Sequence, residues 1–295
     1  MSVTRHPLIL ALVAALAACG RAPERAPTAV TLDDFGDTVR VGAPAQRVVS
    51  LNPVTTELVF ALGAGERLVG RTHWDLYPEA ARAVPDVGDG MMPNVEAVLG
   101  QRPDLVLLYA SESNRAAAAQ LRRAGIATLT YRTDRIADLA RVTPVIAAAL
   151  GRDAAGRTVV DTVTAALDSL RALPAPTPRL RAFWHVWDAP LLTIGRGSYL
   201  SELLEIAGGE NLFSDLDAPS PQVTLEEVAR RDPDVILAGP NGAATLRAHA
   251  AWAAVRAVRE GRVLVLDTTI VGRPGVRMAE AARHLRALLA AEGAR

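Results

Sequence analysis

Side chains able to bind a small molecule gather at the carboxyl ends of the strands that this sequence predicts. Trp74, Tyr109 and Trp187 stand there, although aromatic residues make up only 4% of the chain. Ligands of open α/β sheets bind beyond the carboxyl ends of the strands, and rings with broad apolar area suit a large planar or amphipathic ligand. We therefore predict a ligand site at these ends, with Asn52 as a polar contributor. Trp184, nearer the middle of its strand, is expected in the core.

Two histidines, His73 and His185, also stand at strand ends, in different halves of the chain. Neutral imidazole is a common metal ligand, so the pair could coordinate a metal ion or a metallo-macrocycle from either side. A specific zinc or manganese site normally needs three or four clustered ligands, which two remote histidines do not supply. Both side chains are predicted to contact ligand, and no dedicated metal site is expected.

Signals for catalysis are sparse. The chain has neither a His-Glu-x-x-His helix nor a Gly-x-Ser-x-Gly elbow, and residues 195–198 resemble the elbow only loosely. Ser198 with His185 is the one nucleophile and base that could serve a lipid-anchored α/β hydrolase, which is an alternative class. A Gly-Ser turn is also an ordinary helix N-cap that can present backbone amides to a ligand. We expect a binding protein with Ser198 at the ligand, and not an enzyme.

The elements that must position these side chains occur in two copies. Residues 95–108 and 225–238 both read as an acidic first turn, a short amphipathic helix, a Pro-Asp break and a buried apolar strand. Proline ends each helix, and the apolar run after it has the length of a parallel core strand. Residues 57–68 and 202–212 are a second matched pair in the same order. Such connections can recur by chance, but the kept order favours two similar α/β lobes.

Residues 136–173 place apolar side chains at helical spacing without a strand signal. Pro144 should bend or restart a helix there, and Gly151 weakens it. We predict one long helix or two collinear ones, forming a stiff connector. The predicted organisation is an N-terminal α/β lobe at 45–135, a connecting helix at 136–174 and a C-terminal α/β lobe at 175–295.

The amino terminus has the pattern of an export signal. Residues 8–15 are apolar but too short to span a bilayer, and Cys19 follows small residues. Residues 1–19 thus predict a signal peptide with a bacterial lipobox, in which the Cys19 thiol is acylated. An ordinary signal peptide that ends before a cysteine is the alternative, but Cys19 is the only cysteine and has no disulfide partner within the chain. Residues 20–44 would form a tether and an N-terminal segment.

The charge balance limits the partners of this protein. The chain carries 32 basic and 32 acidic residues, so its net charge is zero. No general attraction to polyanions follows, and nucleic acid is disfavoured as a partner. We expect a monomer at the periplasm or the outer cell face, held to a membrane by a lipid on Cys19.

Several motifs together resemble one family of transport receptors. They are residues 47–53 with the Thr-Glu-Leu at 56–58, the two Pro-Asp repeats, and residues 204–212. As a set they resemble the helical-backbone metal receptors, which are substrate-binding proteins of ABC importers for cobalamin, haem and ferric siderophores. Residues 88–96 and 219–226 are most similar to the cobalamin-binding branch. The resemblance runs from about residue 31 to the carboxyl terminus.

This resemblance implies two Rossmann-like lobes joined by one long helix, with a corrinoid, or alternatively haem or a ferric siderophore, held between them as transported ligand and not as a cofactor. It also implies that Glu96 and Glu226, one on each lobe, pair with arginines of a permease dimer that works with ATPase subunits. Both acids equally suit a helix N-terminus, where the macrodipole favours negative charge. Arg273 would offer hydrogen bonds to the ligand. Ser220 replaces a tryptophan that is frequent in the cobalamin-binding branch, and would also face the ligand.

Overall fold

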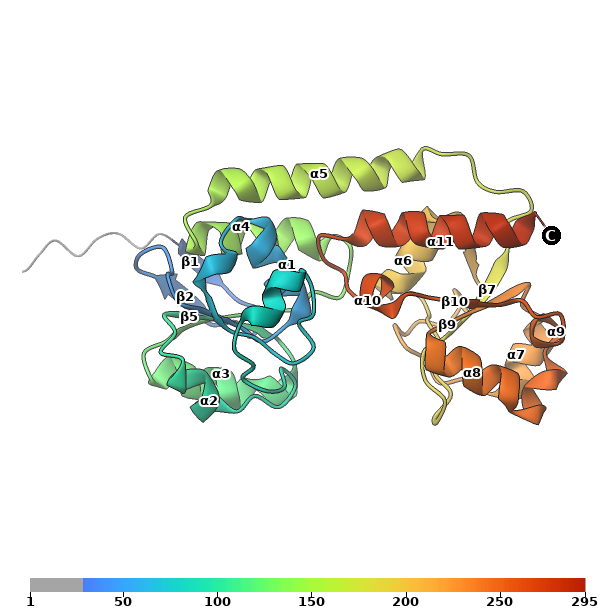
Figure 1. The fold of residues 1–295 in the computed structure, drawn as a ribbon, viewed down its shortest axis with the longest axis horizontal. Coiled ribbons are helices and arrows are strands. Elements are labelled where there is room, and N and C mark those ends of the chain that lie inside the picture. Colours follow the sequence, from blue (N-terminus) through green and yellow to red (C-terminus); the bar gives the residue numbers. More distant parts are fainter. Residues whose placement is uncertain (1–28, 295) are drawn as a thin grey trace, which may run out of the picture.

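The computed structural model describes residues 29–294, so Cys19 and the predicted signal peptide lie outside the described residues. Two lobes lie side by side, and one helix bridges them along an edge (Figure 1). Each lobe holds a four-stranded sheet. Within the described range, no helix combines the length and the apolar character needed to cross a bilayer.

The N-terminal lobe has a parallel sheet in the order β4 (Leu68–Gly70), β3 (Val48–Ser50), β5 (Leu105–Tyr109) and β6 (Ala127–Tyr131). Strand β5 matches the apolar run predicted within residues 95–108, and the sheet is buried on both faces. One face packs against α1 (Pro53–Ala61) and α4 (Asp138–Ala149), and the other packs against α2 (Val95–Gly100) and α3 (Arg115–Arg123).

Helix α1 begins earlier than the sequence suggested. A proline after a strand and a Thr-Thr-Glu run suggest that the strand ends at Pro53 and that the helix starts at Thr55. Instead Pro53 is the first helical residue, a position where its missing N–H group has no helical partner to lose. Asn52 is the cap, and its Oδ1 accepts a hydrogen bond from Val54 N at 2.9 Å. Strand β3 and helix α1 are therefore joined by a two-residue turn, which fixes Asn52 at the predicted site.

A small antiparallel hairpin precedes the N-terminal lobe. It consists of β1 (Ala29–Leu32) and β2 (Thr38–Val41). Val39 and Val41 are buried in the core cluster that also holds α1 and α4 side chains. The described part of the segment that we grouped with the tether therefore packs onto the lobe.

The connector between the lobes differs from the predicted single helix or collinear pair. Helix α4 is separated from α5 (Asp153–Arg171) by a turn at Gly151, whose φ is +62°. The two helices then pack side by side. They come so close that a Cβ on Gly156 would lie only 2.6 Å from that of Ala147. Pro144 sits inside α4 without ending it. A left-handed glycine thus folds the segment back, and α5 alone of the two bridges the lobes (Figure 1).

The C-terminal lobe repeats the design of the first. Its parallel sheet has the order β8 (Glu210–Asn211), β7 (Arg181–His185), β9 (Val235–Ala238) and β10 (Val263–Val265). Counted along each lobe, both sheets run second, first, third, fourth strand. The matching order confirms the two similar α/β lobes that the sequence repeats predicted.

Helices cover both faces of the second sheet as well. One face packs against α5, α6 (Tyr199–Ile206) and α11 (Met278–Gly293). The other packs against α7 (Leu225–Arg231), α8 (Pro240–Ala248) and α9 (Arg256–Arg259), while α10 (Thr268–Val271) is a single turn before α11. Trp184 is 4% exposed within the first of these clusters, which confirms its predicted core position.

The repeat extends to individual hydrogen bonds. Asp104 Oδ1 accepts a bond from Arg47 N at 3.0 Å, and Asp234 Oδ2 accepts one from Arg181 N at 2.9 Å. In each lobe the aspartate of the Pro-Asp pair therefore fixes the start of the neighbouring first strand. These aspartates hold the fold, and so they need no role in binding.

Candidate ligand-binding site

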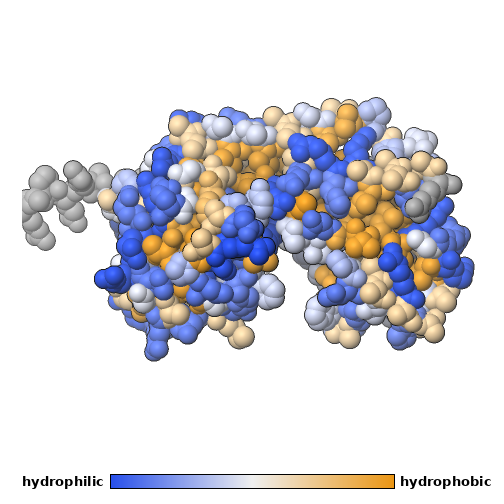
Figure 2. Space-filling model, in the orientation of Figure 1, coloured by the Kyte–Doolittle hydropathy of each residue, from blue (hydrophilic) through white to orange (hydrophobic). Residues whose placement is uncertain are grey.

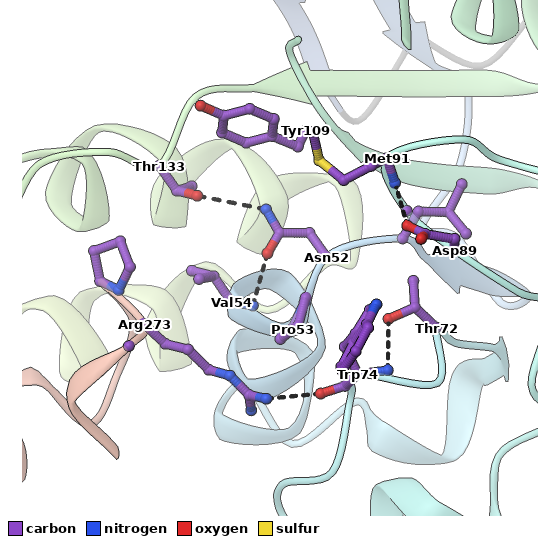
Figure 3. A pocket seen from close by; sticks show the side chains of 14 residues that line it. Asn52, Pro53, Val54, Thr72, Trp74, Asp89, Met91, Tyr109, Thr133 and Arg273 are labelled. Atoms are coloured by element: carbon purple, nitrogen blue, oxygen red, sulfur yellow. Dashed lines mark hydrogen bonds between the residues drawn. The ribbon is translucent and has the colours of Figure 1, made fainter. Parts of the chain in front are cut away.

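A cavity of about 360 Å³ lies at the carboxyl ends of β3 and β5, where the strand order of the first sheet changes direction. Open α/β sheets bind ligands at such points, and the volume is typical of a small-molecule site. Polar and apolar side chains from both lobes line it, among them Asn52, Thr72, Trp74, Asp89, Met91, Tyr109, Thr133 and Arg273 (Figure 3).

Asn52 and Tyr109 are oriented by their own hydrogen bonds. Asn52 uses Oδ1 to cap α1 and points Nδ2 toward Thr133 Oγ1 at 3.5 Å (Figure 3). The Tyr109 hydroxyl donates to Asp134 Oδ1 at 2.7 Å. Burial, together with this bond, raises the pKa of Tyr109 to about 12, so the phenol stays neutral. Both side chains are positioned before a ligand arrives, which lowers the entropic cost of binding.

Trp74 presents an indole to the same cavity with 58% of the residue exposed. Its backbone is held from two sides, since Thr72 Oγ1 accepts from Trp74 N at 3.3 Å and Arg273 Nη2 donates to Trp74 O at 2.7 Å. The His73 ring lies 4.7 Å from the Trp74 ring, centroid to centroid. An exposed ring on a fixed backbone is suited to stack on a flat ligand.

Asp75 anchors the Trp74 loop from beneath. The aspartate is fully buried, and its carboxylate accepts bonds from the hydroxyls of Thr56 and Thr72, both at 2.6 Å. Burial raises the pKa of Asp75, while these hydrogen bonds oppose the change. The carboxylate therefore ties helix α1 to the loop that follows β4.

Arg273 reaches this cavity from the other lobe, in the loop between α10 and α11. Its Nη1 donates to Glu57 Oε1 at 3.1 Å, and Glu57 is itself only 2% exposed. Burial raises the pKa of Glu57, and the bond to Arg273 opposes this shift. A second donor serves Trp74 O, so two of the five N–H groups of the arginine are used within the protein.

A second cavity, of about 480 Å³, occupies the equivalent place in the C-terminal lobe, at the ends of β7 and β9. Trp187 stands in its wall with 62% of the residue exposed. His185 is buried, and its Nε2 lies 2.9 Å from Asp188 Oδ1. A Cβ on Gly242 would come within 2.6 Å of His185 Nδ1, so the absence of a side chain there makes room for the ring.

Gly272 lines both cavities, so they are two halves of one cleft between the lobes. Figure 2 shows this hollow opening on the side of the molecule away from α5. A ligand in the cleft would contact the first lobe at Trp74 and the second at Trp187. The cleft lies at the strand ends where we predicted a ligand site, and ligand binding there stays a prediction.

The cleft brings together most of the predicted site residues. Asn52, Trp74, Tyr109 and Arg273 line its first half, and His185 and Trp187 line the second. The other three predicted residues, His73, Ser198 and Ser220, are not among the lining residues of either half. Their contact with a ligand stays a prediction.

Two of these residues are serines in different surroundings. Ser198 is buried as the cap of α6, where its Oγ accepts a bond from Leu200 N at 3.2 Å. Ser220 is exposed in the loop before the Pro-Gln-Val motif. Among the described residues no hydrogen bond joins Ser198 to His185, so the structure does not pair them as nucleophile and base.

Several lining residues escaped the sequence reasoning. Asp89 Oδ1 accepts a bond from Met91 N at 2.7 Å, and both residues face the first half of the cleft (Figure 3). Gly90, between these two residues, is the sequence feature that marks this loop. A Cβ on Gly90 would lie 2.0 Å from Leu51 O, so the loop can approach the end of β3 this closely only with glycine. Thr133 and Asn241 also line the cleft and were not predicted. They follow the carboxyl ends of β6 and β9.

Metal ligands do not cluster in the described part of the chain. Within residues 29–294, no group of three or more histidine, cysteine, aspartate or glutamate side chains is placed to hold a metal ion. His185 is buried against Asp188, and His73 is exposed beside Trp74. The cleft therefore offers surfaces for a ligand and no complete coordination sphere.

Glu96 and Glu226 occupy the same place in α2 and α7, within the first turn of each helix. The helices are capped alike, by Asn94 accepting from Ala97 N and by Thr224 accepting from Glu227 N. Both glutamates are exposed, and among the described residues neither forms an ion pair. Helices α2 and α7 lie on the side of the molecule away from α5 (Figure 1).

Two matching α/β lobes, one bridging helix and a cleft lined from both sides define a two-lobed ligand-binding protein. Residues 48–269 match the Periplasmic binding protein family, and the chain belongs to this family. Its members are transport proteins that bind small ligands outside the cytoplasm and deliver them to ABC permeases. The protein is therefore a substrate-binding protein of an ABC importer, from a family of transport proteins and not of enzymes, whose ligands are cargo and not cofactors.

Characterised relatives and solved structures agree with this assignment. The chain is 28% identical to the vitamin B12-binding protein of Vibrio cholerae over 82% of its own length and 88% of the relative. The crystal structure of that organism's periplasmic protein BtuF superposes with a TM-score of 0.73, covering 85% of this chain and 99% of BtuF at 27% identity. The heme-binding protein BhuT, solved with two hemes, gives a TM-score of 0.76 at 27% identity over 85% of this chain and all of BhuT (100%).

A Gram-positive protein is similar over a comparable length. The substrate-binding lipoprotein YvrC of Bacillus subtilis, whose function is uncharacterised, is 29% identical over 87% of this chain and 84% of YvrC. These similarities confirm a helical-backbone receptor that leans toward the cobalamin-binding branch.

Proposed function

We propose that this receptor captures a corrinoid, cobalamin or cobinamide, in the cleft between its lobes and delivers it to an ABC permease. The observation that carries the proposal is the charge of the cleft. Among its described lining residues, Arg273 is the one arginine, and it is engaged by Glu57 and by Trp74 O. The acidic residues Asp89 and Asp188 line the two halves.

A corrin ring suits this charge distribution. Its edge carries neutral amide side chains, which need donors and acceptors but no counter-charge. Asn52, Thr133 and Asn241 offer such groups, and the exposed indoles of Trp74 and Trp187 offer area for the faces of the ring. The similarity to vitamin B12-binding proteins supports the same ligand.

Haem is the second candidate ligand, and the similarity to BhuT favours it. Haem carries two propionates, and ferric siderophores are commonly anionic. Burying a carboxylate without a free cationic partner is unfavourable, and more so beside Asp89 or Asp188. We therefore place haem and ferric siderophores behind corrinoids.

A titration of four ligands tests the proposal. Purified residues 20–295 would be titrated with cyanocobalamin, cobinamide, haemin and a ferric siderophore, and followed by absorbance and calorimetry. We expect one corrinoid per chain and weaker binding of haemin and siderophore. Tighter binding of haemin than of both corrinoids would overturn the ligand assignment but leave the receptor role intact.

The anchor and the partner complete the proposed function. Acylation of Cys19 would hold the receptor at the membrane, on the periplasmic or outer face, where the permease works. The similarity to the substrate-binding lipoprotein YvrC of Bacillus subtilis supports this. We further propose that Glu96 and Glu226 dock onto basic pockets of a permease dimer that is coupled to ATPase subunits, with one monomeric receptor spanning both permease subunits.

A further inference from the structure

Two ion pairs join the lobes across their shared seam. On one side, Arg273 of the C-terminal lobe binds Glu57 of helix α1, with Nη1 3.1 Å from Oε1. On the other, Arg135, which follows β6 of the N-terminal lobe, binds Glu202 of helix α6. Each lobe thus contributes one glutamate and one arginine. We call these contacts the Glu57 clasp and the Glu202 clasp.

The two clasps are related by the internal repeat of the chain. Glu57 and Glu202 occupy matching places in the repeated helices α1 and α6, which follow the first strand of each lobe. Arg135 and Arg273 both follow the last strand of their lobe, β6 and β10. The same arrangement therefore appears twice, with the glutamate of each lobe binding the arginine of the other.

The two ion pairs differ in how deeply their side chains are buried, and therefore in how much they contribute to holding the lobes. The side chains of Glu57 and Arg273 are only 1% and 17% exposed, whereas those of Glu202 and Arg135 are 31% and 51% exposed. Water and salt screen the exposed pair, so it contributes little. Removing one partner of a buried pair leaves the other charge without compensation, which is far more disruptive.

The Glu57 clasp also reaches the ligand cleft, and the Glu202 clasp does not. Arg273 lines the first half of the cleft and donates to Trp74 O at 2.7 Å (Figure 3). Because Arg273 also binds Glu57, the glutamate holds the arginine that holds the Trp74 loop. Beside it, a Cβ on Gly275 would be 3.4 Å from Val54 Cγ1, which places the C-terminal loop directly against helix α1.

We infer that Glu57 is a positioning residue of the ligand cleft: through Arg273 it fixes the spacing of the two lobes and the place of Trp74, while the Glu202 clasp is dispensable. The inference deepens the proposed function, since it names how the binding surface is held. Glu57 acts only through Arg273, because its side chain is buried and is not among the residues that line the cleft.

Interlobe distance is the readout that separates this inference from the ligand assignment. Residues 20–295 contain no cysteine, so spin labels can be placed at Ala116→Cys on α3 and Ala244→Cys on α8, both exposed positions. Pulsed EPR without ligand would be compared for the parent, Glu57→Gln and Glu202→Gln. We expect a broadened or shifted distance distribution in Glu57→Gln only. Cyanocobalamin affinity, measured alongside, should fall about tenfold or more in Glu57→Gln and stay within about twofold in Glu202→Gln.

The outcomes distinguish the two ideas. If the parent binds no cyanocobalamin, the ligand assignment fails while the distance measurement still decides the role of Glu57. Should Glu57→Gln fail to fold, Arg273→Gln breaks the same clasp from its more exposed side and must give the same broadening, with partial rescue in Arg273→Lys. Distance distributions equal to the parent in the folded variants overturn the inference. Equal broadening in Glu202→Gln would also overturn it, because the clasps would then be equivalent.

Discussion

Trp74 and Trp187 face one cleft from opposite lobes, 58% and 62% exposed respectively. Exposed indoles leave apolar area in contact with water, and covering that area is favourable. Their backbones are tied down, Trp74 through Thr72 and Arg273 and Trp187 through a bridge to Leu192. The protein thus keeps two flat apolar surfaces ready on either side of the space where a ligand would enter.

Alanine at either tryptophan should weaken ligand binding. Burial of one aromatic face contributes roughly 1 to 3 kcal/mol, so Trp74→Ala and Trp187→Ala should each raise the Kd for cyanocobalamin or cobinamide about tenfold or more. Leu32→Ala, at an exposed apolar position outside the cleft, is the control and should leave the Kd unchanged. Calorimetry on the three variants measures the effect, and unchanged affinity in both tryptophan variants would remove these rings from the site.

Asp75 gives the stability a dependence on pH. Burial raises its pKa above the ordinary 3.8, so between that value and the raised one the native state binds more protons than the unfolded state. The contribution of Asp75 to stability is therefore fully present below the ordinary pKa and is lost as pH rises through the raised one. Thr56, Thr72 and Arg273 face the carboxylate, and each lowers the pKa without cancelling the rise.

Asp75→Asn should remove this part of the pH dependence. Urea unfolding at about pH 4 to pH 7 should show that the variant loses less stability, or gains more, than wild type as pH rises. At neutral pH the variant should still be destabilised by roughly 1–3 kcal/mol, because each carboxylate oxygen accepts from one threonine hydroxyl and an amide NH₂ replaces one of these two acceptors. Parallel curves for the two proteins would contradict the assignment to Asp75.

Local sequence patterns foretold much of the architecture. The strands β5 and β9 were predicted from apolar runs, since a strand buried on both faces leaves this mark in any context. The fold-back at Gly151 was not, because helical periodicity is the same for collinear and for antiparallel helices. The direction of α5 relative to α4 depends on Gly151 in its left-handed conformation and on the packing of the two helices, and the periodicity encodes neither.

The candidate site also contains residues that local sequence reveals and a contact that it does not. Asn52, Trp74, Tyr109 and Trp187 could be found because strand ends are visible in the sequence and face the cleft in this topology. The bond between Glu57 and Arg273 could not, because it joins residues far apart in the chain across a seam between lobes. Arg273 was predicted as a donor to the ligand, and this stays a prediction: it lines the cleft, while two of its N–H groups bind Glu57 and Trp74 O.

Closure around the ligand should be modest. Helix α5 bridges the lobes as one continuous element, and α11 packs along it. A packed helix resists bending more than a pair of flexible strands, and the buried Glu57 clasp adds a second constraint. X-ray scattering with and without cyanocobalamin should therefore give nearly equal radii of gyration, and a large decrease on binding would indicate a flexible hinge.

Cys19 should decide the location of the receptor. With Cys19→Ala the acylation site is lost, so the protein should appear in the soluble extracytoplasmic fraction, and labelling with radioactive palmitate should disappear. Wild type expressed at the same level is the control and should stay with the membranes. A variant as firmly membrane-bound as wild type would contradict a lipid anchor at this residue.

The last prediction concerns delivery to the permease. Glu96 and Glu226 are exposed, equivalent in the two lobes and free of ion pairs with other described residues, so their carboxylates are available to a partner. Each exposed pair with an arginine would contribute only about 0.2 to 1 kcal/mol, and more if docking removes water. Neither glutamate lines the cleft, so docking and ligand binding should be separable.

The double variant Glu96→Ala, Glu226→Ala should thus keep wild-type stability and ligand affinity while losing uptake and affinity for the permease. Glu79→Ala with Glu210→Ala, which removes one exposed carboxylate from each lobe at non-equivalent places, is the matched control for charge and should transport normally. Ligand affinity, permease affinity and uptake would be measured on the same preparations. Loss of ligand binding would place these acids in the binding site after all, and normal uptake would show that docking depends on other residues.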